Sequence, residues 1–377
     1  MKTLKEFYVT RKAIVVFIAG LMLMIGGCMF QQGSKASDSS EYTYAAISFT
    51  PDSQKLVFNR SNPGRSDHSR IHILDLKTKA LSYYEPPANQ VWYAAKFSPS
   101  GKQVVFVMAP RTPGSLPKED KNQFYTDWGN AQIAIMDADG RNVRRLTNTS
   151  GYKMSPNFSW SGKKVIFTQG EMRAPGSKSI AAGLDAYEID LESGHIRQLT
   201  DFRFFQLGRP SYLPGDEQFV VDANGPSKIP GVARGGNVEY WRNSEKKYND
   251  SQVYVFNAMA GSQKLEPLFG QLIHASAPVV DAQGNLYFYA SNGRTLRHYQ
   301  SMKDGVLRNY SDLPPPNQFR GITLQPRYRE VAPDGSRLAV VTGSRDPGDY
   351  RGIFLLDFAT DRWEEIHVPV EAHLINR

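Results

Sequence analysis

Seven histidines are the side chains in this chain best suited to acid–base or metal chemistry. They are His68, His72, His195, His274, His298, His367 and His373. A metal site needs several histidine or carboxylate ligands that converge on one point. His68 and His274 could both approach the one face on which long loops are expected, but two ligands do not make a site. The sequence therefore predicts neither a metal site nor a bound cofactor.

Other catalytic signatures are incomplete or missing. The run Asp137-Ala138-Asp139-Gly140 begins like a calcium loop but lacks the later ligands, so it reads as a hairpin turn. The chain contains no Gly-x-Ser-x-Gly nucleophile motif, no P-loop and no dinucleotide fingerprint. We therefore predict no catalytic residue and favour a binding protein over an enzyme.

One phrase organises the rest of the chain. The stretch Phe97-Ser98-Pro99-Ser100-Gly101-Lys102 joins two apolar runs, and Ser, Pro and Gly suit a reversal of direction. Looser copies make six in all, centred near residues 51, 99, 160, 214, 282 and 333. Repetition at this spacing indicates a repeat architecture in one domain.

Each repeat unit holds up to four short apolar runs. In the second unit they are Trp92–Phe97, Gln103–Val107, Gln132–Asp137 and Val143–Thr147. Four short strands per unit predict the blades of a propeller, so we expect an all-β, six-bladed β-propeller. A β-sandwich is the alternative, but it does not explain the repetition. In the fourth unit we expect strands at Val253–Asn257 and Lys264–Leu268, and Val368–Leu374 is a candidate for closing the ring.

Long insertions lie between the second and third strands of the units. Because strands alternate in direction, these insertions should emerge on one face, which we call the loop face. They hold 16 Lys or Arg and 10 Asp or Glu, and basic and aromatic side chains together are typical of binding surfaces. Solvated loops without a partner are the alternative. The predicted partner-binding residues are Arg65, Arg111, Tyr125, Trp128, Arg173, Arg234, Tyr240, Trp241 and Arg242.

The N-terminus reads as an export signal. Four basic residues precede the apolar run Ala13–Ile25, which ends in Gly26-Gly27-Cys28. This ending resembles the lipobox of bacterial lipoproteins, which implies cleavage after residue 27 and lipidation (palmitate included) of Cys28. An uncleaved membrane anchor is the alternative. Residues 28–41 then form a lipidated tether, and residues 42–377 form the propeller.

The repeats also resemble a known family. Phe97-Ser98-Pro99-Ser100-Gly101 and Ala332-Pro333-Asp334-Gly335, with unit ends such as Arg145-Leu146-Thr147, look like the repeats of TolB-type β-propellers. The resemblance covers about residues 42–367 and implies the fold. We expect no separate α/β domain like that of TolB in this chain, so a role in the same envelope system is not predicted.

These features combine into one functional hypothesis. The chain is expected to be an extracytoplasmic propeller, lipid-anchored to a bacterial membrane (the outer membrane in a diderm), that binds an envelope protein or an anionic glycan. The alternative is a propeller lyase or dehydrogenase acting on an anionic polysaccharide or sugar. The formal net charge of +8 favours anionic partners, but export makes nucleic acid an implausible one.

Overall fold

Strands dominate the computed structural model of this chain. The structure describes residues 42–61, 70–112, 121–173, 180–226, 251–260, 264–269, 274–291, 298–303, 306–309, 324–342 and 352–375. Within these ranges the strands form six hydrogen-bonded sheets. Neighbouring strands within each sheet are antiparallel, with one exception described below.

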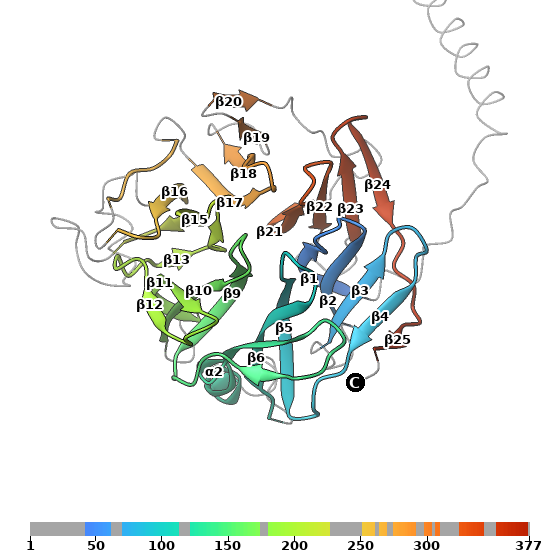
Figure 1. Cartoon of the computed structure of the whole chain (residues 1–377), viewed down its shortest axis with the longest axis horizontal. Coiled ribbons are helices and arrows are strands. Elements are labelled where there is room, and N and C mark those ends of the chain that lie inside the picture. Colours follow the sequence, from blue (N-terminus) through green and yellow to red (C-terminus); the bar gives the residue numbers. More distant parts are fainter. Residues whose placement is uncertain are drawn as a thin grey trace, which may run out of the picture. The chain divides into compact units, whose positions relative to one another are not determined.

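The first three sheets take their strands in chain order (Figure 1). The first contains β1 (Thr43–Phe49), β2 (Lys55–Ser61), β3 (Ile71–Asp75) and β4 (Leu81–Tyr84). The second contains β5 (Gln90–Phe97), β6 (Gln103–Pro110), β7 (Gln132–Asp137) and β8 (Arg144–Arg145). The third contains β9 (Tyr152–Phe158), β10 (Lys164–Met172), β11 (Ala181–Asp190) and β12 (Ile196–Gln198).

The fourth sheet departs from this pattern because its first strand is broken. Both β13 (Gln206–Leu207) and β14 (Ser211–Tyr212) pair with β15 (Gln218–Asn224), which also pairs with β16 (Gln252–Asn257). The fifth sheet contains β17 (His274–Val280), β18 (Leu286–Ser291), β19 (His298–Lys303) and β20 (Val306–Asn309). The sixth contains β21 (Leu324–Val331), β22 (Arg337–Thr342), β23 (Gly352–Asp357) and β24 (Arg362–Ile366).

The repeated phrase makes the same turn in every sheet. The backbone N–H of its fourth residue donates to the carbonyl of its first, as from Gly101 to Ser98 (2.8 Å). That fourth residue always has a positive φ, between 59° and 80°. Glycine adopts this conformation without strain, which explains why four of the six copies place it there. The six residues are Ser53, Gly101, Gly162, Asp216, Gly284 and Gly335.

The core lies between the faces of neighbouring sheets. Six clusters of buried side chains form, one for each pair of neighbours, including one between the first and sixth sheets. Phe58 and Leu355 belong to this last cluster, and Trp92 and Ile73 belong to the cluster between the first two sheets. Packing of apolar faces against each other is what short strands need for stability. The all-β propeller predicted from the repeats is confirmed.

The first strands of the sheets surround a common centre (Figure 1). Contacts run from β1 to β5, from β5 to β9, from β9 to β14, from β14 to β17, from β17 to β21, and from β21 back to β1. Six strand edges therefore face one axis.

The C-terminal segment returns to the first sheet. The short strand β25 (His373–Leu374) pairs in parallel with β4, and the N–H of Ile375 donates to the carbonyl of Tyr83 (3.0 Å). Before this strand, the guanidinium of Arg60 donates to the carbonyls of Pro369 (2.6 Å) and Val370 (3.1 Å). The candidate segment Val368–Leu374 therefore contacts the first sheet, where β25 is a fifth strand beside β4.

Two expectations about local structure were wrong. Residues 264–268 form no strand; Leu268 alone donates a backbone hydrogen bond to Val253 (2.8 Å). The insertion of the second sheet contains a helix, α2 (Lys121–Gly129), which was not predicted. Tertiary contacts hold it, since the Asp127 carboxylate accepts from the backbone N–H (3.0 Å) and hydroxyl (3.1 Å) of Thr112. No helix in the described ranges is long and apolar enough to span a membrane.

Candidate functional site

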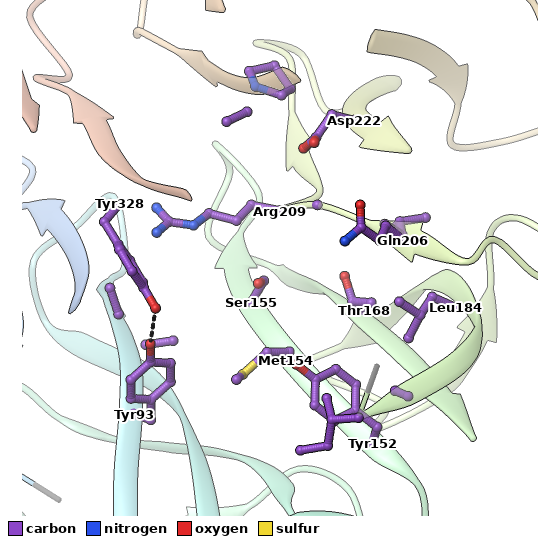
Figure 2. A pocket seen from close by; sticks show the side chains of 18 of the residues that line it. Tyr93, Tyr152, Met154, Ser155, Thr168, Leu184, Gln206, Arg209, Asp222 and Tyr328 are labelled. Carbon is purple, nitrogen blue, oxygen red and sulfur yellow. Dashed lines mark hydrogen bonds between the residues drawn. The ribbon is translucent and has the colours of Figure 1, made fainter. Parts of the chain in front are cut away.

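A cavity of about 260 Å³ lies on the axis, where the first strands of the sheets meet. We call it the axial cavity. Every sheet contributes to its wall through a first strand, and Figure 2 shows its polar side chains directed into a shared space. Each of the six sheets, taken in chain order, supplies one of the following wall residues: Ala46, Tyr93, Ser155, Leu207, Ala277 and Tyr328.

The cavity wall contains strained backbone. Ala46, Ala94, Ser155 and Ala277 have φ values between 49° and 56°, although none is glycine. Each lies where its first strand shifts register against the second strand. A left-handed conformation costs a non-glycine residue about 1–2 kcal/mol. All four residues line the axial cavity, and strained residues of this kind cluster at binding and catalytic sites.

A partly buried ion pair lies near the guanidinium of Arg209, which lines the axial cavity. The ammonium group of Lys96 lies 2.5 Å from the Glu330 carboxylate, and the guanidinium of Arg209 lies 3.6 Å from it. Removal from water lowers the pKa of Lys96, and the charge of Glu330 partly offsets this effect. Below the ion pair, a second hollow of about 280 Å³ opens among the repeated turns, lined in part by Pro51, Pro99 and Pro333. Lys96 and Glu330 both line this second hollow.

Hydrogen bonds across sheets hold the wall of the axial cavity in place. The hydroxyls of Tyr93 and Tyr328 lie 3.3 Å apart (Figure 2). The guanidinium of Arg329 is buried and donates to the carbonyls of Ser276 (2.5 Å) and Ala277 (2.9 Å for Nε). Arg329, in the neighbouring strand β21, thus stabilises β17 at the point where the register of β17 shifts. A pocket built in this way is largely formed before any ligand arrives.

Beside the axial cavity, an open groove of about 850 Å³ runs between α2 and the third sheet. We call it the lateral groove. Tyr125 and Arg173 line it, together with an ion pair between Arg203 and Glu171 (2.9 Å). At its inner end lies Asp185, which is 2% exposed and accepts hydrogen bonds from the Thr200 hydroxyl and two backbone N–H groups. Burial raises the pKa of Asp185 to about 7.

The described part of the chain contains four of the predicted partner-binding residues. Tyr125 and Arg173 line the lateral groove, and Arg173 also lies over the ring of Phe205, which lines the axial cavity (4.9 Å). Trp128 packs edge-on against Tyr93 of the cavity wall (6.0 Å) and is partly buried, so its ring supports the wall. Arg111 follows β6, where its N–H donates to the Asn89 carbonyl (2.8 Å). Outside the described residues lie Cys28, Arg65, Arg234, Tyr240, Trp241 and Arg242.

Two of the histidines lie in different sheets. His72 is buried in β3, and His195 is exposed in the turn between β11 and β12. In the ranges that the structure describes, no three His, Cys, Asp or Glu side chains converge as metal ligands would. The run 137–140 forms a hairpin turn, with the Gly140 N–H donating to the Asp137 carbonyl (2.9 Å). That prediction is confirmed.

The polar residues of the axial cavity were missed in the sequence. Thr168, Gln206, Arg209 and Asp222 lie on different strands and turns and share no motif. Their one local signal is Gly208-Arg209-Pro210, which breaks the first strand of the fourth sheet. Only the packing of the third and fourth sheets brings these four side chains to one cavity.

Comparison with known proteins gives structural neighbours only. No model of a protein family matches the chain, and no curated protein matches it in sequence. TolB from Acinetobacter baumannii is similar in structure, with a TM-score of 0.53 and 13% identity, over 85% of this chain and 62% of TolB. An oligogalacturonate lyase from Vibrio parahaemolyticus has a TM-score of 0.53 and 12% identity, over 86% of this chain and 79% of the lyase.

The tricorn protease is similar as well, with a TM-score of 0.50 and 14% identity, over 87% of this chain but only 26% of the protease. The chain thus spans less than two thirds of TolB and about a quarter of the protease. At these identities the neighbours show a TolB-like β-propeller fold. Because the neighbours include a lyase and a protease besides TolB, the fold does not choose among their activities.

Proposed function

We propose that this TolB-like propeller is a six-bladed, lipid-anchored binding protein of the bacterial cell envelope. Cleavage after residue 27 and lipidation of Cys28 would attach it to a membrane outside the cytoplasm. Residues 28–41 would act as a tether, and the loop face would bind an envelope protein. The six sheets, each packed against two neighbours, support the assignment of six blades.

The lateral groove is the observation that carries the binding role. Tyr125 and Arg173 were predicted as contact residues from composition alone, and both line this groove. Arg and Tyr are enriched among the residues that dominate binding energy at protein interfaces. The groove is also next to the axial cavity, because the Arg173 guanidinium lies over Phe205. A partner seated in the groove would therefore contact a rigid surface built by α2 and the third sheet.

Site-specific photo-crosslinking in cells tests this role. A photoreactive phenylalanine analogue replaces Tyr125 in the groove or, as the control, Lys102 in the exposed turn between β5 and β6. We expect one dominant envelope protein to crosslink from position 125 and not from position 102. The Arg173→Ala change should reduce that crosslink, while the Lys102→Ala change should leave it intact. Equal crosslinking from both positions would refute specific binding of a partner at the loop face.

The enzyme hypothesis gives a different result in the same cells. If no protein crosslinks from position 125, the purified chain is assayed with uronic-acid polymers, because one structural neighbour is an oligogalacturonate lyase. Turnover of such a polymer would replace the binding role with catalysis on an anionic polysaccharide. We expect no turnover.

The anchor has an independent test. The Cys28→Ala variant should fail to incorporate labelled palmitate and should leave the membrane fraction. Wild type should incorporate the label and remain in the membrane fraction. Palmitate labelling that persists in the variant would contradict lipidation at Cys28. A variant that stays in the membrane without label would instead favour the uncleaved anchor.

A further inference from the structure

The side chain of Asp222 forms part of the wall of the axial cavity and lies directly beside Gly208. Its carboxylate lies against the backbone of Gly208, so closely that a Cβ atom at residue 208 would come within 1.7 Å of Oδ1. Gly208 has no positive φ, so a glycine is needed there for space. The N–H of Gly208 also donates to the Asp222 carbonyl (2.6 Å). Because glycine has no side chain, residue 208 leaves room for the Asp222 carboxylate at the cavity.

The Asp222 carboxylate lacks a charge partner within the described residues. The hydroxyl of Ser251 donates to Oδ2 (3.1 Å), and no described basic side chain forms an ion pair with Asp222. Asp222 is only partly buried, and Figure 2 shows its oxygens on the cavity side. Carboxylates at such sites gain most from a positively charged hydrogen-bond donor, because charge-assisted hydrogen bonds are the strong ones.

Two further polar side chains face the same space. Thr168 is 1% exposed and lines the cavity, and its hydroxyl has no hydrogen-bond partner in the described structure. A buried hydroxyl without a partner is unfavourable, and a ligand with a donor or acceptor group can satisfy it. The amide oxygen of Gln206 accepts from Asn224 (3.0 Å), so that its NH₂ group is directed to the cavity (Figure 2).

Positive charge lies at the other side of this space. Arg209 follows Gly208 in the chain, and its guanidinium extends across the cavity toward Tyr328 (Figure 2). The contacts of its Nη1 atom, to the Arg329 carbonyl (3.1 Å) and Glu330 (3.6 Å), hold it at the base of the cavity. Asp222 and Arg209 therefore give the cavity a negative and a positive pole.

We propose that the axial cavity binds a small zwitterion of the amino-acid or short-peptide class. Asp222 would accept from the ammonium group, and Arg209 with the Gln206 amide would donate to the carboxylate. Tyr152, Phe205 and Leu184 supply an apolar wall for the side chain of the ligand. Charges of both signs match a zwitterion better than an anion or a cation, each of which would meet a like charge. This inference goes beyond the proposed partner binding and does not depend on it.

Isothermal titration calorimetry on the full chain, purified in detergent, tests the proposal. The probes are L-phenylalanine, L-leucine and the dipeptide L-alanyl-L-phenylalanine. N-acetyl-L-phenylalanine lacks the ammonium group, and L-phenylalanine amide lacks the carboxylate. We expect saturable binding of at least one zwitterion, and binding at least about tenfold weaker for both charge-deleted analogues. A dipeptide that binds more tightly than both amino acids would identify the source as peptides.

Variants locate the site. Asp222→Asn keeps the shape and an acceptor for Ser251, and it should weaken zwitterion binding at least about tenfold. Glu192→Gln, in the exposed turn after β11, is the matched control and should bind as wild type does. Equal binding of the acetylated and free amino acids would overturn the proposal, as would the absence of binding by all three zwitterions at millimolar concentration. The analogue series uses wild-type protein, so it decides even if Asp222→Asn fails to fold.

Discussion

His72 offers a quantitative prediction about how stability depends on pH. Its side chain is 4% exposed, between the ring of Phe58 (centroids 5.9 Å apart) and that of Tyr83 (5.9 Å). Burial, and secondarily the charge of Arg60, lowers the pKa of His72 from 6.5 to about 3. The folded protein thus keeps this imidazole neutral well below pH 6.5.

The sign and size of the effect follow from these two pKa values. Between pH 6.5 and about pH 3 the unfolded chain holds a proton on His72 that the folded chain lacks. The contribution of His72 to the free energy of unfolding therefore falls as the pH decreases through this window. For a group with these values, the loss between pH 7 and pH 5 is about 2 kcal/mol.

Urea unfolding of wild type and the His72→Phe variant at both pH values measures the effect. The relevant quantity is the difference in unfolding free energy between variant and wild type, because Asp185 and other groups titrate alike in both. Since phenylalanine takes up no proton, this difference should shift in favour of the variant by about 2 kcal/mol from pH 7 to pH 5. The exposed-histidine variant His195→Gln is the control and should show no such shift. A His72→Phe difference that is the same at both pH values would refute the reasoning.

Three further predictions follow from the structure. Burial raises the pKa of Asp185 from 3.8 to about 7, so the contribution of Asp185 to stability should fall as the pH rises through this window. The difference in unfolding free energy between Asp185→Asn and wild type should therefore shift in favour of the variant as the pH rises, as measured by urea unfolding. Gly208→Ala should destabilise the fold by about 1–3 kcal/mol, because the new Cβ atom would clash with the Asp222 carboxylate. The same change should destabilise an Asp222→Ala variant clearly less, and an equal loss of stability in both backgrounds would contradict the contact between residues 208 and 222. Deletion of residues 371–377 removes the pairing of β25 with β4 and should lower the free energy of unfolding by about 2 kcal/mol. An unchanged melting temperature would contradict a stabilising role of this pairing.

The sequence by itself determined the repeat and its turns. Ser98-Pro99-Ser100-Gly101 and its copies specify a local event, a tight turn with a left-handed fourth residue, and the six turns share that geometry. Alternating apolar runs on both sides predicted the strands and hence the propeller. Local conformational preference and burial of one face are properties that a short stretch of chain carries within itself.

The helix and the broken strand came from tertiary structure. The helix α2 has little amphipathic pattern of its own; contacts of Asp127 with Thr112 and of Trp128 with Tyr93 hold it. The first strand of the fourth sheet breaks at Gly208, where the Asp222 carboxylate needs the space. Neither feature is visible in hydrophobic periodicity, because each depends on a partner that lies elsewhere in the chain.

The axial cavity is the feature that only the tertiary structure decided. Its wall takes residues from all six sheets, from Ala46 in β1 to Arg329 in β21. The side chain that points at the axis depends on the register of each first strand, and a bulge shifts that register within the strand. A charge pair such as Lys96 and Glu330, 234 residues apart, forms because the ring brings the second and sixth sheets to one axis. Sequence patterns report which residues are buried in a strand, whereas the meeting of distant strands at one point is a property of the closed fold.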